Sequence, residues 1–218
     1  MGRIAAASQN EPTDARRMVP CLDEPSFKAN WTVTVIHPKG TKAVSNGIET
    51  NGEGEVSGDW IISKFESTPR MSSYLLAVVV SEFDYIEGFT KTGVRFRIWS
   101  RPEAMNMTGY ARDAGIRCLE YYEKFFDIKF PLKKQDMVAL PDFSAGAMEN
   151  WGLITYRVQS EEVAGRTANH LHRRIHKNRC SVSNMVTTRG NEYDRLCKGC
   201  RHKMFGILRK FLRHQISS

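Results

Sequence analysis

Short apolar segments separated by turn-forming residues dominate the first hundred residues, and this pattern constrains the fold more than any other feature. In residues 30–38 the side chains alternate, with Trp31, Val33 and Val35 on one face, as a half-buried strand requires. Further strand-like segments follow, namely DWIISKFES, SYLLAVVVSEFDYIEG and VRFRIWS. Turn sequences such as NGEGE and SGD separate them. The spacing predicts an antiparallel sheet or sandwich over residues 1–100, in which the apolar run YLLAVVV is buried on both faces.

The sequence period changes from that of strands to that of a helix after residue 100. From Glu103 to Phe126 apolar residues recur at helical spacing, which predicts a helix with a wide buried face. The expected members of this face are Tyr110, Ala114, Cys118, Tyr121 and Phe125. The segments DMVALPDF and GLITYR then resemble two strands around SAGAMEN. A helix followed by strands predicts a second domain over residues 101–157.

The charge of the chain is concentrated in its last part. Residues 158–218 contain 13 Lys and Arg against 4 Asp and Glu, whereas residues 1–157 contain 19 against 20. The main body therefore gives no reason to expect a nucleic-acid partner. The polar composition after residue 158 predicts a poorly ordered tail, irregular or helical. No run of eighteen apolar residues occurs, so we expect no transmembrane segment.

The segment GAMEN, residues 146–150, carries the clearest chemistry. Gly146 and Ala147 are small enough for a peptide backbone to lie alongside them as an added strand. Glu149 supplies a carboxylate that can hold a free α-ammonium group through a charge-assisted hydrogen bond. An enzyme that removes one residue from an N-terminus must recognise that cation. The five residues alone fit equally well a tight turn with a solvent-exposed Glu.

Longer stretches around this motif resemble the aminopeptidase N-like zinc metallo-aminopeptidases, peptidase family M1. They are SQNEPTDARRMVPCLDEPSFKANW, STPRMSSYLLAVVVSEFDYIE and CLEYYEKFFDIKFPLKKQDMVALPDFSAGAMENWGLITYR. They occur in family order over residues 8–157. The resemblance implies a partial N-terminal β domain over residues 1–100 and the start of an α+β thermolysin-like catalytic domain over residues 101–157. It also implies a chain truncated at both ends relative to a complete enzyme.

The resemblance further implies which residues bind substrate, a peptide with a free N-terminus. Glu149 is similar to the family's amine anchor, and Glu11 is similar to its second acidic anchor, contributed by the β domain. Considered alone, Glu11 fits a solvated loop acid. Two carboxylates from two domains around one ammonium group would select for N-terminal residues. The expected substrate-binding set is Glu11, Gly146, Ala147, Met148, Glu149 and Asn150.

The zinc site of the family has no counterpart that we can identify in this sequence. Enzymes of this type need His-Glu-x-x-His on a helix and a later Glu, which together supply the zinc ligands and the general base. The stretch HRRIH keeps the spacing with His172 and His176 but has Arg173 in the position of the base, and a guanidinium stays charged. We therefore expect neither catalytic residues nor metal ligands in this chain, although zinc serves the complete family. We also expect the resemblance to end at Arg157, with residues 158–218 a divergent basic tail.

Three functions remain open at this point. The first is a fragment or truncated isoform of a zinc metallo-aminopeptidase, without catalysis of its own. The second is a non-catalytic module that binds peptide N-termini or regulates, and pairs with, a full-length aminopeptidase. The third concerns the tail, where Cys197, Cys200 and His202 would hold a structural zinc with Cys180 or His176, although a solvated cationic tail fits better. The compartment stays open, because family members are membrane ectoenzymes or cytoplasmic.

Overall fold

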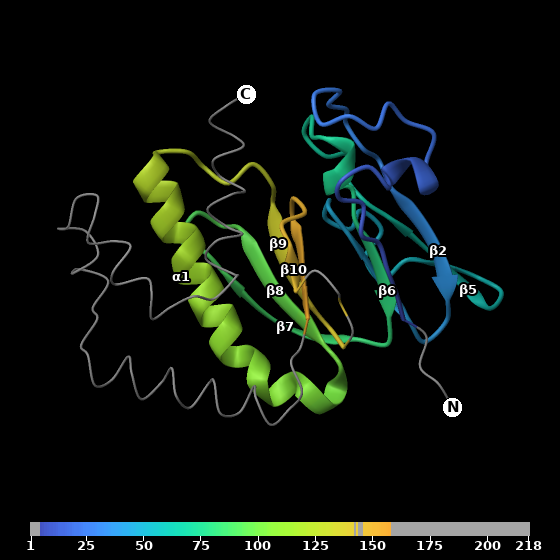
Figure 1. The fold of residues 1–218 in the computed structure, drawn as a ribbon. Coiled ribbons are helices and arrows are strands. Elements are labelled where there is room, and N and C mark those ends of the chain that lie inside the picture. The colour runs from blue at the N-terminus through green and yellow to red at the C-terminus, as the bar shows by residue number, and fades with distance from the viewer. Residues whose placement is uncertain (1–4, 142, 144–145, 158–218) are drawn as a thin grey trace.

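The computed structural model describes residues 5–141, 143 and 146–157, in which the strands form three sheets. Figure 1 shows the sheets side by side, with helix α1 (Thr108–Phe126) at one side of the molecule. The strands are β1 (Ala5–Ala7), β2 (Thr34–Pro38), β3 (Lys42–Ser45), β4 (Glu55–Ser57), β5 (Trp60–Lys64), β6 (Val78–Ser81), β7 (Asp84–Phe89), β8 (Arg95–Ser100), β9 (Lys134–Leu140), β10 (Ala147–Met148) and β11 (Leu153–Arg157). Short 3₁₀ helices are η1 (Ala15–Arg17), η2 (Ser73–Leu75) and η3 (Pro102–Met107).

The N-terminal part is a small antiparallel sandwich, which confirms the predicted sheet or sandwich. One sheet has the order β2-β5-β4 and the other the order β1-β6-β3. A compact core between them contains Ala43, Phe65 and Val80, with Val33 and Val35 packed against it. The alternation predicted for residues 30–38 is therefore correct, because Val33 and Val35 point inward.

The sheet β1-β6-β3 lies in the middle of the molecule and is buried on both faces. Ala43 pairs with Val80 and contributes to the sandwich core. Val44 pairs with Val79, one residue along, and both enter the main core on the opposite face. The expected burial of YLLAVVV is confirmed, although only residues 78–81 are strand and the preceding residues include the turn of η2.

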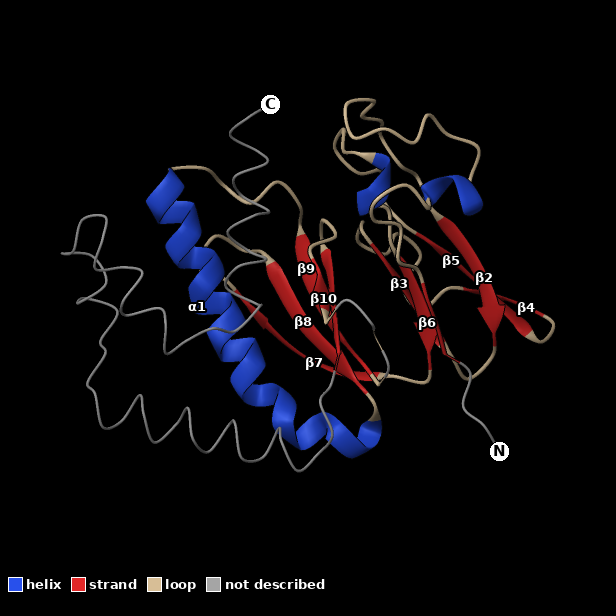
Figure 2. Ribbon diagram, viewed as in Figure 1, coloured by secondary structure: helices blue, strands red, loops and turns tan. Residues whose placement is uncertain are grey.

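The third sheet is mixed and has the order β10-β11-β9-β8-β7. β7 and β8 form an antiparallel pair, β9 runs parallel to β8 and to β11, and β10 returns antiparallel to β11. The helix α1 supplies the crossover that a parallel β8–β9 pair needs. Figure 2 shows α1 along the outer side of this strand group. A mainly β N-terminal part followed by a helix confirms the predicted fold class, and residues 158–218 lie outside the described part.

The change of sheet comes earlier than the domain boundary that we predicted near Arg101. β7 and β8 belong to the same sheet as β9, so the chain leaves the sandwich between Ser81 and Asp84. Arg101 instead precedes the helical crossover, which begins with Pro102. We propose the position between β6 and β7 as the boundary, and the division at residue 100 stays a prediction about domains.

The buried face of α1 differs from the predicted one in two positions. Tyr110 and Phe125 are 43% and 65% exposed, so their assignment to the core was wrong. The face that packs on the sheet includes Gly115 and Leu119, and a Cβ added at Gly115 would meet the buried ring of Phe96 at 2.3 Å. Because the helix approaches the sheet most closely at Gly115, its buried face differs from the one that the large apolar residues alone predict. Ala114, Cys118 and the half-buried Tyr121 are correctly placed.

The ends of α1 are fixed by local geometry. The helix starts at Thr108, because residues 102–107 form the 3₁₀ turn η3. It ends at Phe126, where Asp127 adopts a φ of +54° and the Ile128 amide donates to the Glu123 carbonyl at 3.2 Å. This is the hydrogen-bond pattern of a left-handed C-terminal cap. No helix in the described part of the chain is long and apolar enough to cross a membrane.

The tight contact at Gly115 yields a stability prediction. Gly115→Ala should destabilise the protein by about 1–3 kcal/mol, because the added methyl group overpacks against Phe96. Gly109→Ala is the matched control, since it lies in the same helix with open space around its Cα, and should be neutral or stabilise by up to about 1 kcal/mol. Urea unfolding measures both changes. Equal effects of the two substitutions would show that the contact with Phe96 does not limit the size of the side chain at position 115.

His37 is a buried polar group in the sandwich. Its Nδ1 lies 2.9 Å from Thr41 Oγ1, and its Nε2 lies 2.9 Å from Ser63 Oγ. The Thr41 hydroxyl donates to the Pro38 carbonyl at 2.6 Å, so it accepts from Nδ1–H, and Nε2 is left to accept from Ser63. Burial lowers the pKa of His37, which favours the neutral ring.

This arrangement predicts a loss of stability in acid. Because the pKa of His37 is lower in the folded state, the unfolded chain binds more protons as the pH falls. The contribution of His37 to the free energy of unfolding is therefore fully present above the ordinary histidine pKa of about 6.5 and decreases below it. Between about pH 7.5 and about pH 5, on either side of the ordinary histidine pKa, the free energy of unfolding should decrease less for His37→Gln than for the unaltered protein. Parallel pH profiles for both proteins would contradict the assignment.

Candidate functional site

The GAMEN segment forms one edge of the mixed sheet. Gly146 has a φ of +76°, and its carbonyl accepts a hydrogen bond from the Arg157 amide at 2.9 Å. β10 follows, with Met148 opposite Thr155 of β11. Within the described residues no second strand pairs with β10. The backbone on its far side is therefore in the position where an added strand would pair.

Glu149 and Asn150 follow β10 directly, and both are buried. Glu149 is only 8% exposed, which contradicts the alternative of a turn with a solvent-exposed Glu. The Leu153 amide donates to the Asn150 carbonyl at 3.1 Å and closes a turn over residues 150–153, in which Gly152 has a φ of +71°. Together with Glu149, which precedes it, we call it the GAMEN turn. The Nδ2 group of Asn150 is buried without a hydrogen-bond partner among the described residues. The turn thus holds one acid and one unpaired donor in the interior.

Glu11 lies in the loop after β1 and is exposed. The neighbouring Asn10 is buried, and its Nδ2 donates to the Leu76 carbonyl at 2.8 Å. The Asn10 carbonyl in turn accepts from the Asp14 amide at 2.9 Å. The backbone beside Glu11 is therefore fixed, while its carboxylate reaches solvent. Two positions earlier, Oε1 of Gln9 is buried without a partner among the described residues.

Tyr74, in η2, links the two acids and was not found by the sequence analysis. Burial raises the pKa of Tyr74, and the carboxylates of Glu149 and Glu11 raise it further. Glu11 and Glu149, from opposite ends of the described chain, therefore both lie within electrostatic range of this half-buried ring. Tyr74 is the first residue of the apolar segment YLLAVVV, and no local sequence pattern there indicates a binding-site residue.

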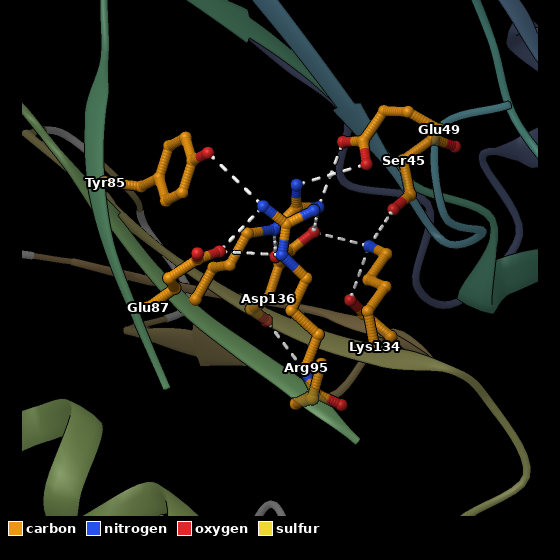
Figure 3. Close-up of polar contacts among 10 residues, drawn as sticks. Ser45, Glu49, Tyr85, Glu87, Arg95, Lys134 and Asp136 are labelled. Carbon is orange, nitrogen blue, oxygen red and sulfur yellow. Dashed lines mark hydrogen bonds and ion pairs between the residues drawn. The ribbon is translucent and has the colours of Figure 1, made fainter. Parts of the chain in front are cut away.

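A buried charge cluster contacts the GAMEN turn at the Gly152 carbonyl. Figure 3 shows Lys134, Asp136 and Glu49 of the cluster. Asp136 accepts two hydrogen bonds from Arg97, and Arg97 Nη2 lies 2.7 Å from Oδ2. Asp136 Oδ2 also accepts from Lys134 Nζ at 2.5 Å. Glu49, from the loop after β3, pairs with Arg97 at 2.9 Å. The cluster joins the loop after β3 to strands β8 and β9.

Charge balance in this cluster depends on Asp136. Asp136 and Lys134 are fully buried. Burial by itself would raise the pKa of Asp136, but the cations of Lys134 and Arg97 bring it below its usual range. The remaining Lys134 N–H groups donate to the carbonyls of Ser45 and Gly152, the latter at 2.9 Å. The ammonium group therefore connects β3, β9 and the end of the GAMEN turn.

Family models match this chain in two places. A model of the peptidase M1 N-terminal domain matches residues 2–75, and a model of the peptidase family M1 domain matches residues 110–178. The chain belongs to peptidase family M1. Within this family, Aminopeptidase N of Haemonchus contortus is 82% identical over 158 residues, which are 72% of this chain and 16% of that protein.

Two human M1 proteins are similar over the same share of the chain. Endoplasmic reticulum aminopeptidase 2 of Homo sapiens is 46% identical over 158 residues, 72% of this chain and 16% of that protein. Aminopeptidase N of Homo sapiens is 44% identical over 162 residues, 72% and 17% respectively. The chain is thus an aminopeptidase N-like M1 sequence that spans about a sixth of the length of these curated relatives.

The second match extends to residue 178, past the end at Arg157 that we expected for the resemblance. The position of that end therefore stays a prediction. His172, His176 and the cysteines of the tail lie outside the described residues. M1 aminopeptidases depend on zinc generally. Within residues 5–141, 143 and 146–157, no three His, Cys, Asp or Glu side chains form a cluster suited to a metal ion.

The charge cluster yields a prediction for Asp136→Asn. This substitution keeps the shape of the side chain but removes the charge that balances Lys134 and Arg97, and should destabilise the protein by about 3–5 kcal/mol. Glu66→Gln is the control, because its pair with Lys133 is exposed and should contribute less than about 1 kcal/mol. Urea unfolding of the two variants gives the comparison. A small effect for Asp136→Asn would mean that the buried cations do not require this counter-charge.

Proposed function

We propose that the site around Tyr74 binds the free N-terminus of a peptide, and that the 218-residue chain binds such peptides without hydrolysing them. The observation that carries the first part is the burial of the Glu149 carboxylate directly after the edge strand β10. The electrostatic effect of both Glu149 and Glu11 on Tyr74 agrees with it. No lysine or arginine among the described residues forms an ion pair with Glu149. A nearly buried carboxylate without a cation is suited to pair with an ammonium group from a ligand.

The neighbouring backbone suits the rest of such a peptide. β10 lies at the edge of its sheet and runs directly into Glu149. A peptide that extends this edge as an added strand would form backbone hydrogen bonds beside Ala147, with its first residue towards the acid. Gln9 Oε1 can accept a hydrogen bond from the ammonium group, and Asn150 Nδ2 can donate one to a peptide carbonyl. Both groups are buried and unpaired within the described part, which supports a ligand that satisfies them.

The 218-residue sequence contains no His-Glu-x-x-His, and HRRIH has Arg173 where a general base would stand. Aminopeptidases, as the relatives are named, hydrolyse the bond after the first residue, which needs an activated water. We infer that the chain contributes recognition of the N-terminus, and that hydrolysis requires groups that it does not supply.

Calorimetry with a short peptide and its N-acetylated form tests the recognition. Acetylation removes the positive charge, and a charge-assisted hydrogen bond contributes about 1.5–3 kcal/mol, so the free peptide should bind about 10- to 100-fold more tightly. Glu149→Gln should reduce this preference. Glu53→Gln, at an exposed turn residue, should leave it unchanged. Equal affinity of the two peptides for the unaltered chain would refute the amine-binding role.

Incubation with an aminoacyl-naphthylamide tests the absence of hydrolysis. The purified chain should release no naphthylamine, with or without added zinc. Release that a chelator abolishes would overturn this part of the proposal, whatever the result of calorimetry.

A further inference from the structure

Asn46 uses its side-chain amide to hold two separate parts of the site. It follows β3 directly and is fully buried. Its Nδ2 donates to the Leu75 carbonyl at 2.8 Å and to the Trp151 carbonyl at 2.7 Å. Its Oδ1 accepts from the Ala77 amide at 2.9 Å. Both donors and the acceptor are thus used on backbone groups far apart in the sequence.

These backbone groups lie next to the residues of the proposed site. Leu75 follows Tyr74, and Trp151 is two residues after Glu149. On the other side, Asn10 precedes Glu11 and donates to the Leu76 carbonyl, between the two groups that Asn46 holds. A continuous series of hydrogen bonds therefore leads from the Glu11 loop through η2 to the GAMEN turn. Two buried asparagines form its connecting members.

The GAMEN turn has little freedom to move relative to Asn46. A Cβ at Gly152 would lie 2.3 Å from the Asn46 carbonyl oxygen, so the two backbones are in direct contact. Lys134 Nζ bridges the neighbouring carbonyls of Ser45 and Gly152 on the same side. The Asp136 amide also donates to the Gly152 carbonyl, at 2.9 Å. The turn is therefore anchored at two successive carbonyls, those of Trp151 and Gly152.

We propose that Asn46 is a positioning residue that sets the distance between the Glu11 and Glu149 carboxylates and thereby makes the site selective for a free peptide amine. The proposal rests on the amine-binding function proposed above. Asn46 touches no ligand in this scheme. Its effect is to keep Tyr74 and the GAMEN turn in register, so that both acids reach the same ammonium group.

The test compares Asn46→Ser with Asn51→Ser in the full chain. Asn51 is a matched control, because it also donates through Nδ2 to a carbonyl, that of Ile62 at 2.7 Å, and accepts an amide, that of Lys64 at 2.9 Å. It lies beside β5 in the outer sheet of the sandwich. Misplacement of a positioned group by about 1 Å costs up to about a hundredfold, so the ratio of the Kd values for acetylated and free peptide should fall by about tenfold in Asn46→Ser. Asn51→Ser should keep the ratio of the unaltered chain.

A second readout needs no peptide. With 3-fluorotyrosine incorporated and the Tyr74 signal assigned from Tyr74→Phe, fluorine NMR follows the titration of this ring. The pKa of Tyr74 should decrease in Asn46→Ser, because the carboxylates move away from it, and should not change in Asn51→Ser. Asn10→Ser removes one hydrogen bond from the same series and should also lower the pKa of Tyr74. This variant replaces Asn46→Ser in the test if Asn46→Ser does not fold.

The outcomes separate the two proposals. If the unaltered chain binds both peptides equally, amine binding fails, and the Tyr74 titration still decides whether Asn46 positions the acids. If the unaltered chain prefers the free peptide but the folded asparagine variants keep both that preference and the Tyr74 titration, the positioning role is refuted. A uniform weakening of both peptides, with the ratio preserved, would likewise refute it and leave Asn46 a purely structural residue.

Discussion

The contact of Asp136 with two cations is the constraint on which the arrangement of the sheets depends. Lys134 and Arg97 project into the layer between the mixed sheet and the middle sheet of the sandwich, where unpaired charges would be unacceptable. Asp136 pairs with both cations, and Glu49 supplies the second negative charge from the sandwich side. Such a cluster tolerates little displacement, because each ion keeps its low energy only with its partners in place. It therefore helps to fix the relative position of the two sheets, which it joins through Glu49–Arg97 and Lys134–Ser45.

The candidate site is assembled across this fixed boundary. The Glu11 loop belongs to the sandwich, Glu149 to the mixed sheet, and Tyr74 to the short η2 turn between them. Neither sheet carries both acids, so the negative potential exists only in the combined structure. β10 adds a strand edge, at which a bound peptide would continue the sheet. In the proposed function, the two carboxylates would identify the free end of a peptide, and the strand edge would bind its backbone whatever its side chains.

Local patterns in the sequence predicted the elements well and their assembly poorly. Alternation around Val33 and Val35 identified a sandwich strand, because each residue faces one layer only. The face of α1 was misassigned at Tyr110 and Phe125, since close packing at Gly115 depends on Phe96 in another element. The motif identified residues 146–150 as candidate binding residues, but it did not predict that Glu149 is buried. Tyr74 and Asn46 carry no local signal, because their partners lie at distant positions in the chain.

The Asn46 contact also bears on how the chain folds during synthesis. The Trp151 carbonyl that Asn46 holds lies 105 residues later in the sequence. At about 5–20 residues per second, it leaves the ribosome about 5–20 s after Asn46 does. The sandwich can form in that interval, but one face of β3 and β6 must wait without its cover. That apolar face of the nascent chain therefore stays exposed until the last strands of the mixed sheet arrive.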